Sequence, residues 1–282
     1  MSATVQAHGP VLVGVDGSTQ NASAVAWAAA EAASFPGAVP LVLVHDTEGS
    51  GESSSVGRAI LERALTEAGR LEPGLHPVTE VHHGGPQQSL RSATTKWSPS
   101  EDEDRGPAML VVGRRGTGAS RRVRLGMTAR RLVHEPGPLT VVVPDGWSPR
   151  LVPRDAPVVV DLGDAPEDSD RALALALSRA AREGRRVVAL LVWSVPPLAA
   201  GLDRAIREIW ADYAGRAERA LAALLEPWRT AYPGVELVGV PTDRHAVSAL
   251  LDHADGAELL VVPRGDRACA IVEYADCPVA VV

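Results

Sequence analysis

Short apolar runs alternate with helical patterns along the whole chain. In the first half these runs are VLVGV (11–15), LVLVH (41–45), PVTEV (77–81), MLVVG (109–113) and LTVVV (139–143). Runs that are apolar throughout are typical of strands buried on both faces of a parallel sheet. Between them lie stretches such as NASAVAWAAAEAA and SVGRAILERALTEAG, which are Ala-rich or amphipathic. The pattern therefore predicts βαβ units joined by right-handed crossovers.

The same order of strands and helices recurs in the second half. Its expected strands are PVVVDL (157–162), RVVALLVW (186–193), VELVGV (235–240), ELLVV (258–262) and PVAVV (278–282). Helical patterns lie between them in DSDRALALALSRAAREG and within 203–231. We expect an α/β fold of two tandem doubly wound domains, 1–149 and 150–282, each with a five-stranded, mainly parallel sheet. The three prolines of GWSPRLVPRDAP (146–157) mark the linker.

Charge and composition narrow the function classes. The net charge of −7 over 282 residues argues against general binding to nucleic acids or membrane surfaces. The N-terminal MSATVQAHGP lacks the apolar segment of a signal peptide, and the chain has no run of about 18 apolar residues. Two cysteines imply no disulfide framework. These features predict a cytoplasmic protein. The acidic stretch SPSEDEDRGP (98–107) is expected to be a solvated loop.

The first strand is followed by a candidate binding residue. Asp16 comes directly after it, with Gly17 and Ser18, and a helix is expected to begin near Asn21. Ligands of open α/β sheets bind at the carboxyl ends of the strands, where a carboxylate accepts hydrogen bonds from a ribose or helps to hold a metal. The alternative is that Asp16 and Ser18 only turn the chain and cap the helix.

The fourth strand is followed by an arginine-rich stretch without acidic residues, LVVGRRGTGASRRVRLGMTARRL (110–132). Its glycines fall in the pattern Gly113-x2-Gly116-x9-Gly126. Glycines let a backbone approach a ligand closely and point several N–H groups at an anion. A helix beginning after Gly126 would add its N-terminus. Arginines at 114, 115, 121, 122 and 124 raise the positive potential. The alternative is a glycine-rich loop with solvated arginines.

Together these residues resemble the universal stress protein family over both halves of the chain. The family's nucleotide-binding motif is G-x2-G-x9-G-[ST], and the aspartate after the first strand corresponds to Asp16. The resemblance implies a five-stranded α/β domain of adenine-nucleotide-binding type. It implies that adenine lies at the end of the second strand, ribose at the aspartate and phosphates at the glycine loop. The implied binding residues are Gly14, Val15, Asp16, Asp46, Val112, Gly113, Arg115, Gly116, Gly126, Met127 and Thr128.

Two positions depart from the family pattern. The Ser/Thr after the third glycine is Met127, with Thr128 following, so one phosphate-binding hydroxyl is missing or displaced. Loss of a hydrogen bond to a charged group costs about 1.5–3 kcal/mol. At the adenine position the chain has Asp46, where the family commonly has an apolar residue. His45 beside it is expected to be a partly buried polar group near the pocket.

The second half lacks both the aspartate after the first strand and the glycine loop after the fourth. In register, Gly163 takes the place of Asp16, flanked by Asp161 and Asp164, and Pro263 takes the place of Gly113. About ten positions are missing after Pro263. Proline lacks an N–H and fixes φ. We interpret 150–282 as a degenerate domain without the phosphate loop.

The leading hypothesis is a stress-response protein that binds one adenine nucleotide, ATP or another, in its first domain and acts as a sensor or interaction module. Whether Mg accompanies the nucleotide stays open. One alternative is an interaction protein of the same fold without nucleotide; the other is a slow ATPase. The chain has neither a P-loop nor a G-x-S-x-G elbow, so an enzyme is the less favoured class, and no catalytic or metal-ligating residue is assigned.

The protein partner is unknown. The resemblance implies that the last strands, LTVVV and PVAVV, pair with each other within the chain as an intramolecular pseudo-dimer. An uncovered apolar edge strand would otherwise be a liability. Homodimerisation through other surfaces stays open.

Overall fold

The computed structural model describes residues 9–35, 39–47, 54–98, 106–117, 123–163, 166–194 and 203–282. It divides into two compact units. Unit 1 comprises Met1–Pro153 together with Arg264–Val282, and unit 2 comprises Arg154–Pro263. The end of the second sequence repeat thus belongs to the compact unit of the first. The boundary at 149/150, drawn from the repeat, stays a prediction.

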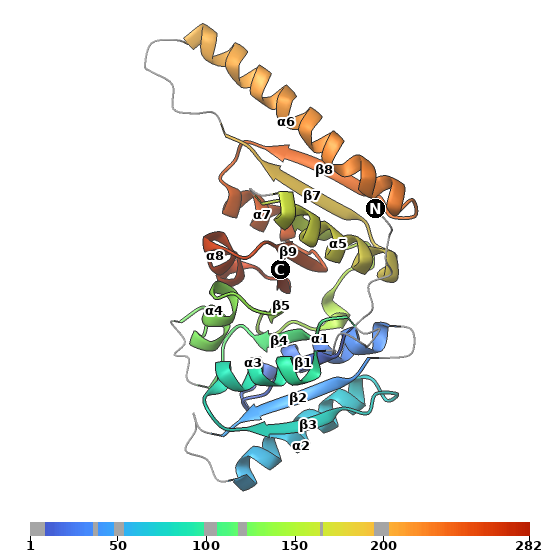
Figure 1. The fold of residues 1–282 in the computed structure, drawn as a ribbon, viewed down its shortest axis with the longest axis vertical. Coiled ribbons are helices and arrows are strands. Elements are labelled where there is room, and N and C mark those ends of the chain that lie inside the picture. Colours follow the sequence, from blue (N-terminus) through green and yellow to red (C-terminus); the bar gives the residue numbers. More distant parts are fainter. Residues whose placement is uncertain are drawn as a thin grey trace. The chain divides into compact units, whose positions relative to one another are not determined.

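Unit 1 is an open α/β sheet with helices on both faces (Figure 1). Its elements are β1 (Val11–Gly14), α1 (Asn21–Ser34), β2 (Leu41–Asp46), α2 (Ser54–Leu71), β3 (Val78–His82), α3 (Pro86–Trp97), β4 (Met109–Gly113), α4 (Met127–His134), β5 (Thr140–Val143), η1 (Pro149–Leu151), α8 (Asp266–Tyr274) and β10 (Val279–Val281).

The strand order in unit 1 is β3-β2-β1-β4-β5-β10. All neighbours from β3 to β5 are parallel. The chain moves outward from β1 to β3, then crosses to the other side of β1 to form β4. With right-handed crossovers this reversal places α1 and α2 on one face and α3 on the other. The reversal between β1 and β4 is the switch point at which doubly wound sheets hold ligands.

The last two strands of unit 1 run antiparallel. Val279 lies opposite Val142, and Val281 lies opposite Thr140. Both strands are buried along their length, and the hydroxyl of Thr140 donates to the carbonyl oxygen of Pro138 at 3.0 Å, so the one polar side chain of β5 is satisfied. The predicted pairing of the terminal strands LTVVV and PVAVV is confirmed.

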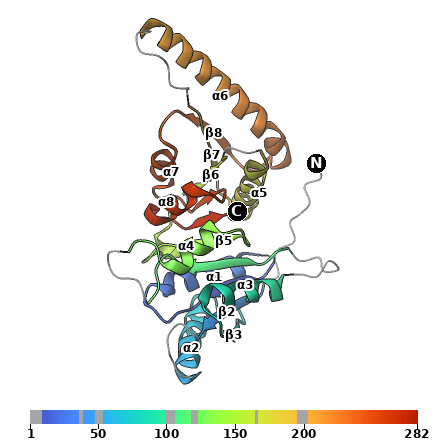
Figure 2. The same ribbon diagram turned by 60° about the vertical axis from the view of Figure 1, so that its left-hand side comes forward.

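Unit 2 has a parallel sheet in the order β9-β6-β7-β8. Its elements are β6 (Val158–Asp161), α5 (Pro166–Glu183), β7 (Val187–Val192), α6 (Asp203–Ala231), β8 (Leu237–Thr242), α7 (Ala246–Ala254) and β9 (Leu259–Val262). The expected long helix within 203–231 is α6, whose 29 residues run beside β8 (Figures 1 and 2). The α/β class with mainly parallel strands is confirmed, and all ten expected strands are present. None of the helices within the described ranges is long and apolar enough to cross a membrane.

A half-buried carboxylate ties strand β3 to helix α3. Glu80 accepts hydrogen bonds from Lys96 Nζ at 2.5 Å, His82 Nε2 at 2.8 Å and Trp97 Nε1 at 2.9 Å, and its side chain is 9% exposed. Burial alone would raise the pKa of Glu80, but the three donors outweigh burial and lower the pKa below its ordinary value of 4.5. The ionised form therefore stabilises the fold.

We predict that Glu80→Gln destabilises unit 1 by about 1 kcal/mol at neutral pH, or about 2–4 °C in unfolding temperature. Because the folded-state pKa is lowered, the contribution of Glu80 is complete above pH 4.5 and is lost as the pH falls through the folded pKa. Thermal unfolding of both proteins at neutral and acidic pH should show the difference shrinking in acid.

Glu67→Gln is the control for this experiment. Glu67 also pairs with a cation, Arg70 at 2.7 Å, but both side chains lie on the exposed face of α2. Exposed pairs of this kind contribute about 0–1 kcal/mol. Equal losses in the two variants would show that Glu80 acts as an ordinary surface charge.

Candidate functional site

The candidate site lies at the switch point, where Asp16 follows β1 and the glycine loop (residues 114–126) follows β4. Asp16 Oδ1 accepts the N–H of Ser18 at 3.0 Å, which makes a local turn at the end of β1. Asp16 Oδ2 accepts the N–H of Thr117 at 2.8 Å, across 101 residues of sequence. The expected proximity of this carboxylate to the loop backbone is therefore present in the structure.

Gly116 makes this approach sterically feasible. A Cβ at this position would lie 2.4 Å from Asp16 Oδ2, closer than any real contact. At the other two motif glycines the neighbours are backbone atoms: a Cβ on Gly113 would lie 3.2 Å from the oxygen of Arg115, and one on Gly126 3.3 Å from that of Arg114. The N–H of Gly126 donates to this oxygen of Arg114 at 2.8 Å, closing the base of the loop.

The arginines of the loop contact the protein itself. Arg115 Nε donates to Asp145 Oδ2 at 2.6 Å, just beyond β5. Arg114 Nη1 donates to the carbonyl oxygens of Glu273 and Ala275, and Arg124 lies over the ring of Tyr274. Arg121 and Arg122 lie outside the described residues. The described arginines thus anchor the loop to its surroundings, a role that their charge alone did not predict.

The predicted adenine position is at the end of β2. Asp46 accepts a hydrogen bond from the hydroxyl of Ser89, which is buried in the first turns of α3. His45 is 3% exposed, so the expectation of partial burial was too weak. Its Nδ1 lies 2.7 Å from the carbonyl oxygen of Val15. Because a carbonyl oxygen only accepts, this contact assigns the proton to Nδ1 and makes His45 a brace between β2 and the end of β1.

The remaining predicted residues form the frame of the site. Gly14 O accepts from Asn21 Nδ2 at 2.7 Å, which fixes the start of α1, and the N–H of Val15 donates to Val44 O. Val112 is buried in β4. Met127 and Thr128 open α4 behind Gly126, whose backbone is extended and offers no capping side chain. Met127 is 70% exposed, so its side chain is not part of the core.

The corresponding place in unit 2 is built differently. The backbone ladders put Gly163 in the position of Asp16 and Pro263 in that of Gly113. Gly163 has φ +64°, and a Cβ there would lie 2.9 Å from the ring of Pro263. Asp161 is buried and accepts the N–H of Gly163 at 3.0 Å. These contacts agree with the sequence register.

The connections after the two equivalent strands differ in length as predicted. Thirteen residues, 114–126, join β4 to α4, whereas three residues, 263–265, join β9 to α8. The second copy therefore has no room for a loop that could return toward the end of its first strand.

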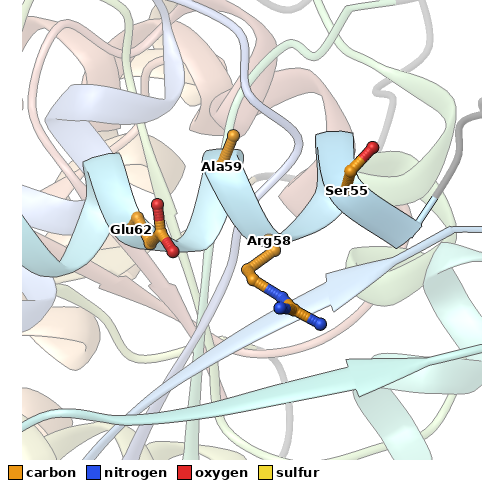
Figure 3. A pocket seen from close by; sticks show the side chains of 4 residues that line it. All are labelled: Ser55, Arg58, Ala59 and Glu62. Atoms are coloured by element: carbon orange, nitrogen blue, oxygen red, sulfur yellow. The ribbon is translucent and has the colours of Figure 1, made fainter.

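An open hollow lies along α2. Figure 3 shows its lining residues, Ser55, Arg58, Ala59 and Glu62, projecting from a single helix. Their spacing is that of one exposed helix face, and the hollow includes none of the predicted site residues. Within the described part of the chain, no group of three or more His, Cys, Asp or Glu side chains is placed to hold a metal ion.

Comparisons with known proteins agree on one family. The model of the universal stress protein family matches residues 8–143. A universal stress protein of Mycobacterium tuberculosis is 31% identical over 271 residues, which cover 89% of this chain and 84% of that protein. The crystal structure of a universal stress protein from Archaeoglobus fulgidus aligns with a TM-score of 0.68 at 14% identity, over 97% of this chain and 95% of that chain.

A shorter universal stress protein from Archaeoglobus fulgidus, solved in complex with dAMP, aligns with 45% of this chain and 96% of its own, with a TM-score of 0.34 and 22% identity.

Sequence reasoning did not find four residues that shape the site: Ser89, Asp145, Glu273 and Tyr274. Each lies far along the chain from the residue that it contacts. The separation is 30 positions for Asp145 and Arg115, and 161 positions for Arg114 and Ala275, which stands two residues after Glu273. The one available signal was that Asp145 stands two residues after the end of β5, as Asp16 stands two residues after the end of β1.

We predict that Gly116→Ala destabilises unit 1 by about 1–3 kcal/mol, because the added methyl group displaces the Asp16 carboxylate and breaks its bond to Thr117. Urea unfolding measures the loss, and amide exchange at Thr117 locates it. Gly74→Ala is the control, since a Cβ there meets nothing within 4 Å. An unchanged stability in Gly116→Ala would mean that the close approach of Asp16 to the loop is not maintained in solution.

Proposed function

The chain belongs to the universal stress protein family, and we propose that unit 1 binds one adenine nucleotide, ATP in the first instance, and signals its bound state to a protein partner in the cytoplasm. One observation carries the proposal: the carboxylate of Asp16 and the backbone N–H of Thr117 meet at 2.8 Å at the switch point of the sheet. This bond supports the proposal because it brings together the residue proposed to accept from ribose and the backbone proposed to face the phosphates.

In the proposed complex Asp16 accepts hydrogen bonds from the ribose hydroxyls. The N–H of Thr117 exchanges the Asp16 carboxylate for an oxygen of the nucleotide. Such an exchange replaces one charge-assisted hydrogen bond by another, so the loop can open at small cost. The absence of a side chain at Gly116 leaves space for this rearrangement beside the carboxylate.

The phosphates are proposed to lie against the start of α4. The first N–H groups of a helix have no partner within the helix and favour an anion, and Gly126 supplies no capping side chain that would compete. Thr128, in the first turn, is half-buried and carries a hydroxyl one residue after the family position occupied by Met127. Titrations with and without Mg decide whether the metal accompanies the nucleotide.

The adenine is proposed to lie near the end of β2. Ser89 donates to the carboxylate of Asp46 and so fixes its position, and Asp46 is proposed to accept from the adenine amino group. Val15 and Val112, which are among the binding residues that the family resemblance implies, are proposed to lie beside the nucleotide between its adenine and its ribose.

The second candidate function is an interaction protein of the same fold that binds no nucleotide. The observation that favours it is the engagement of the loop arginines: Arg115 is paired with Asp145, and Arg114 with the end of α8. Fewer positive charges then face a phosphate than the sequence suggests. Mass spectrometry of ligand released from the purified protein separates the two functions.

We predict one nucleotide per chain. Asp16→Asn should weaken ATP binding about tenfold, since an amide oxygen accepts less strongly than a carboxylate, and Gly116→Val should abolish it. Isothermal titration with ATP, AMP and dAMP measures stoichiometry and affinity. Asp161→Asn is the matched control, because Asp161 accepts a backbone N–H in the same way at the end of β6.

Two equivalent sites per chain would contradict this assignment. So would a single site that is unaffected by Asp16→Asn and Gly116→Val, since the nucleotide would then lie elsewhere.

We further predict that Met127→Ser tightens ATP binding, by up to about 3 kcal/mol, through a hydroxyl at the first residue of α4. Met127 is exposed, so its replacement leaves the core intact. Thr128→Val tests the neighbouring hydroxyl. If Thr128 already contacts the phosphate, Thr128→Val weakens binding and Met127→Ser adds little.

A further inference from the structure

Both ends of the glycine loop contact the same helical turn. At its start, Arg114 Nη1 donates to Ala275 O at 2.9 Å and to Glu273 O at 3.4 Å. Near its end, the guanidinium of Arg124 lies 4.9 Å from the centre of the Tyr274 ring. Residues 273–275 form the last turn of α8 and the residue that follows it. Helix α8 belongs to the second sequence repeat, so the end of this repeat contacts the glycine loop of the first repeat.

These contacts suit the chemistry of a helix end. The last carbonyl oxygens of a helix lack partners within the helix and carry partial negative charge, so a guanidinium is favourable there. A planar guanidinium also binds well over the face of a tyrosine ring. Arg114 is half-buried, whereas Tyr274 is 51% exposed. One contact is thus a fixed anchor and the other lies at the surface.

The arginine after the corresponding strand of the second copy makes the reciprocal contact. Arg264 Nη1 donates to the carbonyl oxygens of Leu132, Val133 and Glu135 at 2.5, 3.1 and 2.9 Å, and its Nη2 donates to Pro138 O at 2.8 Å. These groups surround the C-terminal end of α4. The glycine loop is held by Arg114 at its start, and the helix that follows it is held by Arg264 at its far end.

From this arrangement we propose that residues 273–275, called the seat below, form the contact surface that holds the glycine loop in position. The second copy would then be retained because it positions the loop for nucleotide binding. A loop already held in place loses less conformational entropy when a ligand binds. By linkage, nucleotide binding must in turn change the seat, and this places the readout of the bound state at the exposed ring of Tyr274. The positioning of the loop stands on its own; its effect on affinity rests on the proposed function.

The test uses the full chain and two readouts. Hydrogen exchange of the backbone amides of the loop reports positioning without any ligand, and calorimetry reports the affinity for ATP. Tyr274→Leu and Arg124→Gln should each speed exchange in the loop about threefold to fivefold and weaken ATP binding by a similar factor. Their combination should have no larger effect than either alone, because both remove the same contact.

The matched control is Tyr213→Leu. Arg216 lies over the ring of Tyr213 at 5.8 Å in α6, a contact of the same kind that is remote from the loop in sequence and belongs to unit 2. This variant should leave loop exchange and affinity unchanged. Arg114→Gln removes the other contact between the loop and the seat, and circular dichroism shows whether this variant keeps its fold.

The outcomes separate the two proposals. Loop exchange that is unchanged in Tyr274→Leu, Arg124→Gln and Arg114→Gln overturns the seat, whether or not ATP binds. If loop exchange is faster in these variants but the wild-type protein binds no nucleotide, the result supports the seat and contradicts the proposed function.

Discussion

The antiparallel pairing of β5 with β10 is the interaction on which the arrangement of the site depends. The pairing returns the end of the chain to the first unit, because β10 lies beside β5 with Val279 opposite Val142. Helix α8 comes immediately before β10, so the pairing brings its last turn to the glycine loop. Without this strand pair, β5 would be an apolar edge strand and Arg114 would have no helix end to bind.

The fold was predictable because its signals are local and repeated. Each apolar run coincides with a strand to within two residues at either end, and the turn from β1 into α1 follows from Asp16, Ser18 and Asn21. The loss of the second loop was also visible, since a deletion and a proline can be read from the sequence. The bond between Asp16 and Thr117 follows from topology, because both residues follow strands that become neighbours.

The side-chain partners within the site were less predictable. The arginines of the loop were interpreted as a positive field, yet Arg115 pairs with Asp145 and Arg114 with α8. An arginine can neutralise a ligand or an element of its own chain, and composition does not distinguish the two. The choice depends on which acceptors the tertiary fold leaves within reach. The carbonyl oxygens at the end of a helix carry no sequence signature at all, which is why the roles of Arg114 and Arg264 emerge only from the structure.

The difference between the two copies follows from the geometry at the ends of their equivalent strands. A copy that binds a phosphate needs a long backbone segment free to approach the end of its first strand, and Gly116 permits this approach beside Asp16. In the other copy the ring of Pro263 fills the space next to Gly163, and three residues lead straight into α8. The first copy thus keeps the long connection, whereas the second copy lacks it and instead supplies the end of α8, which contacts Arg114 and Arg124 of that connection.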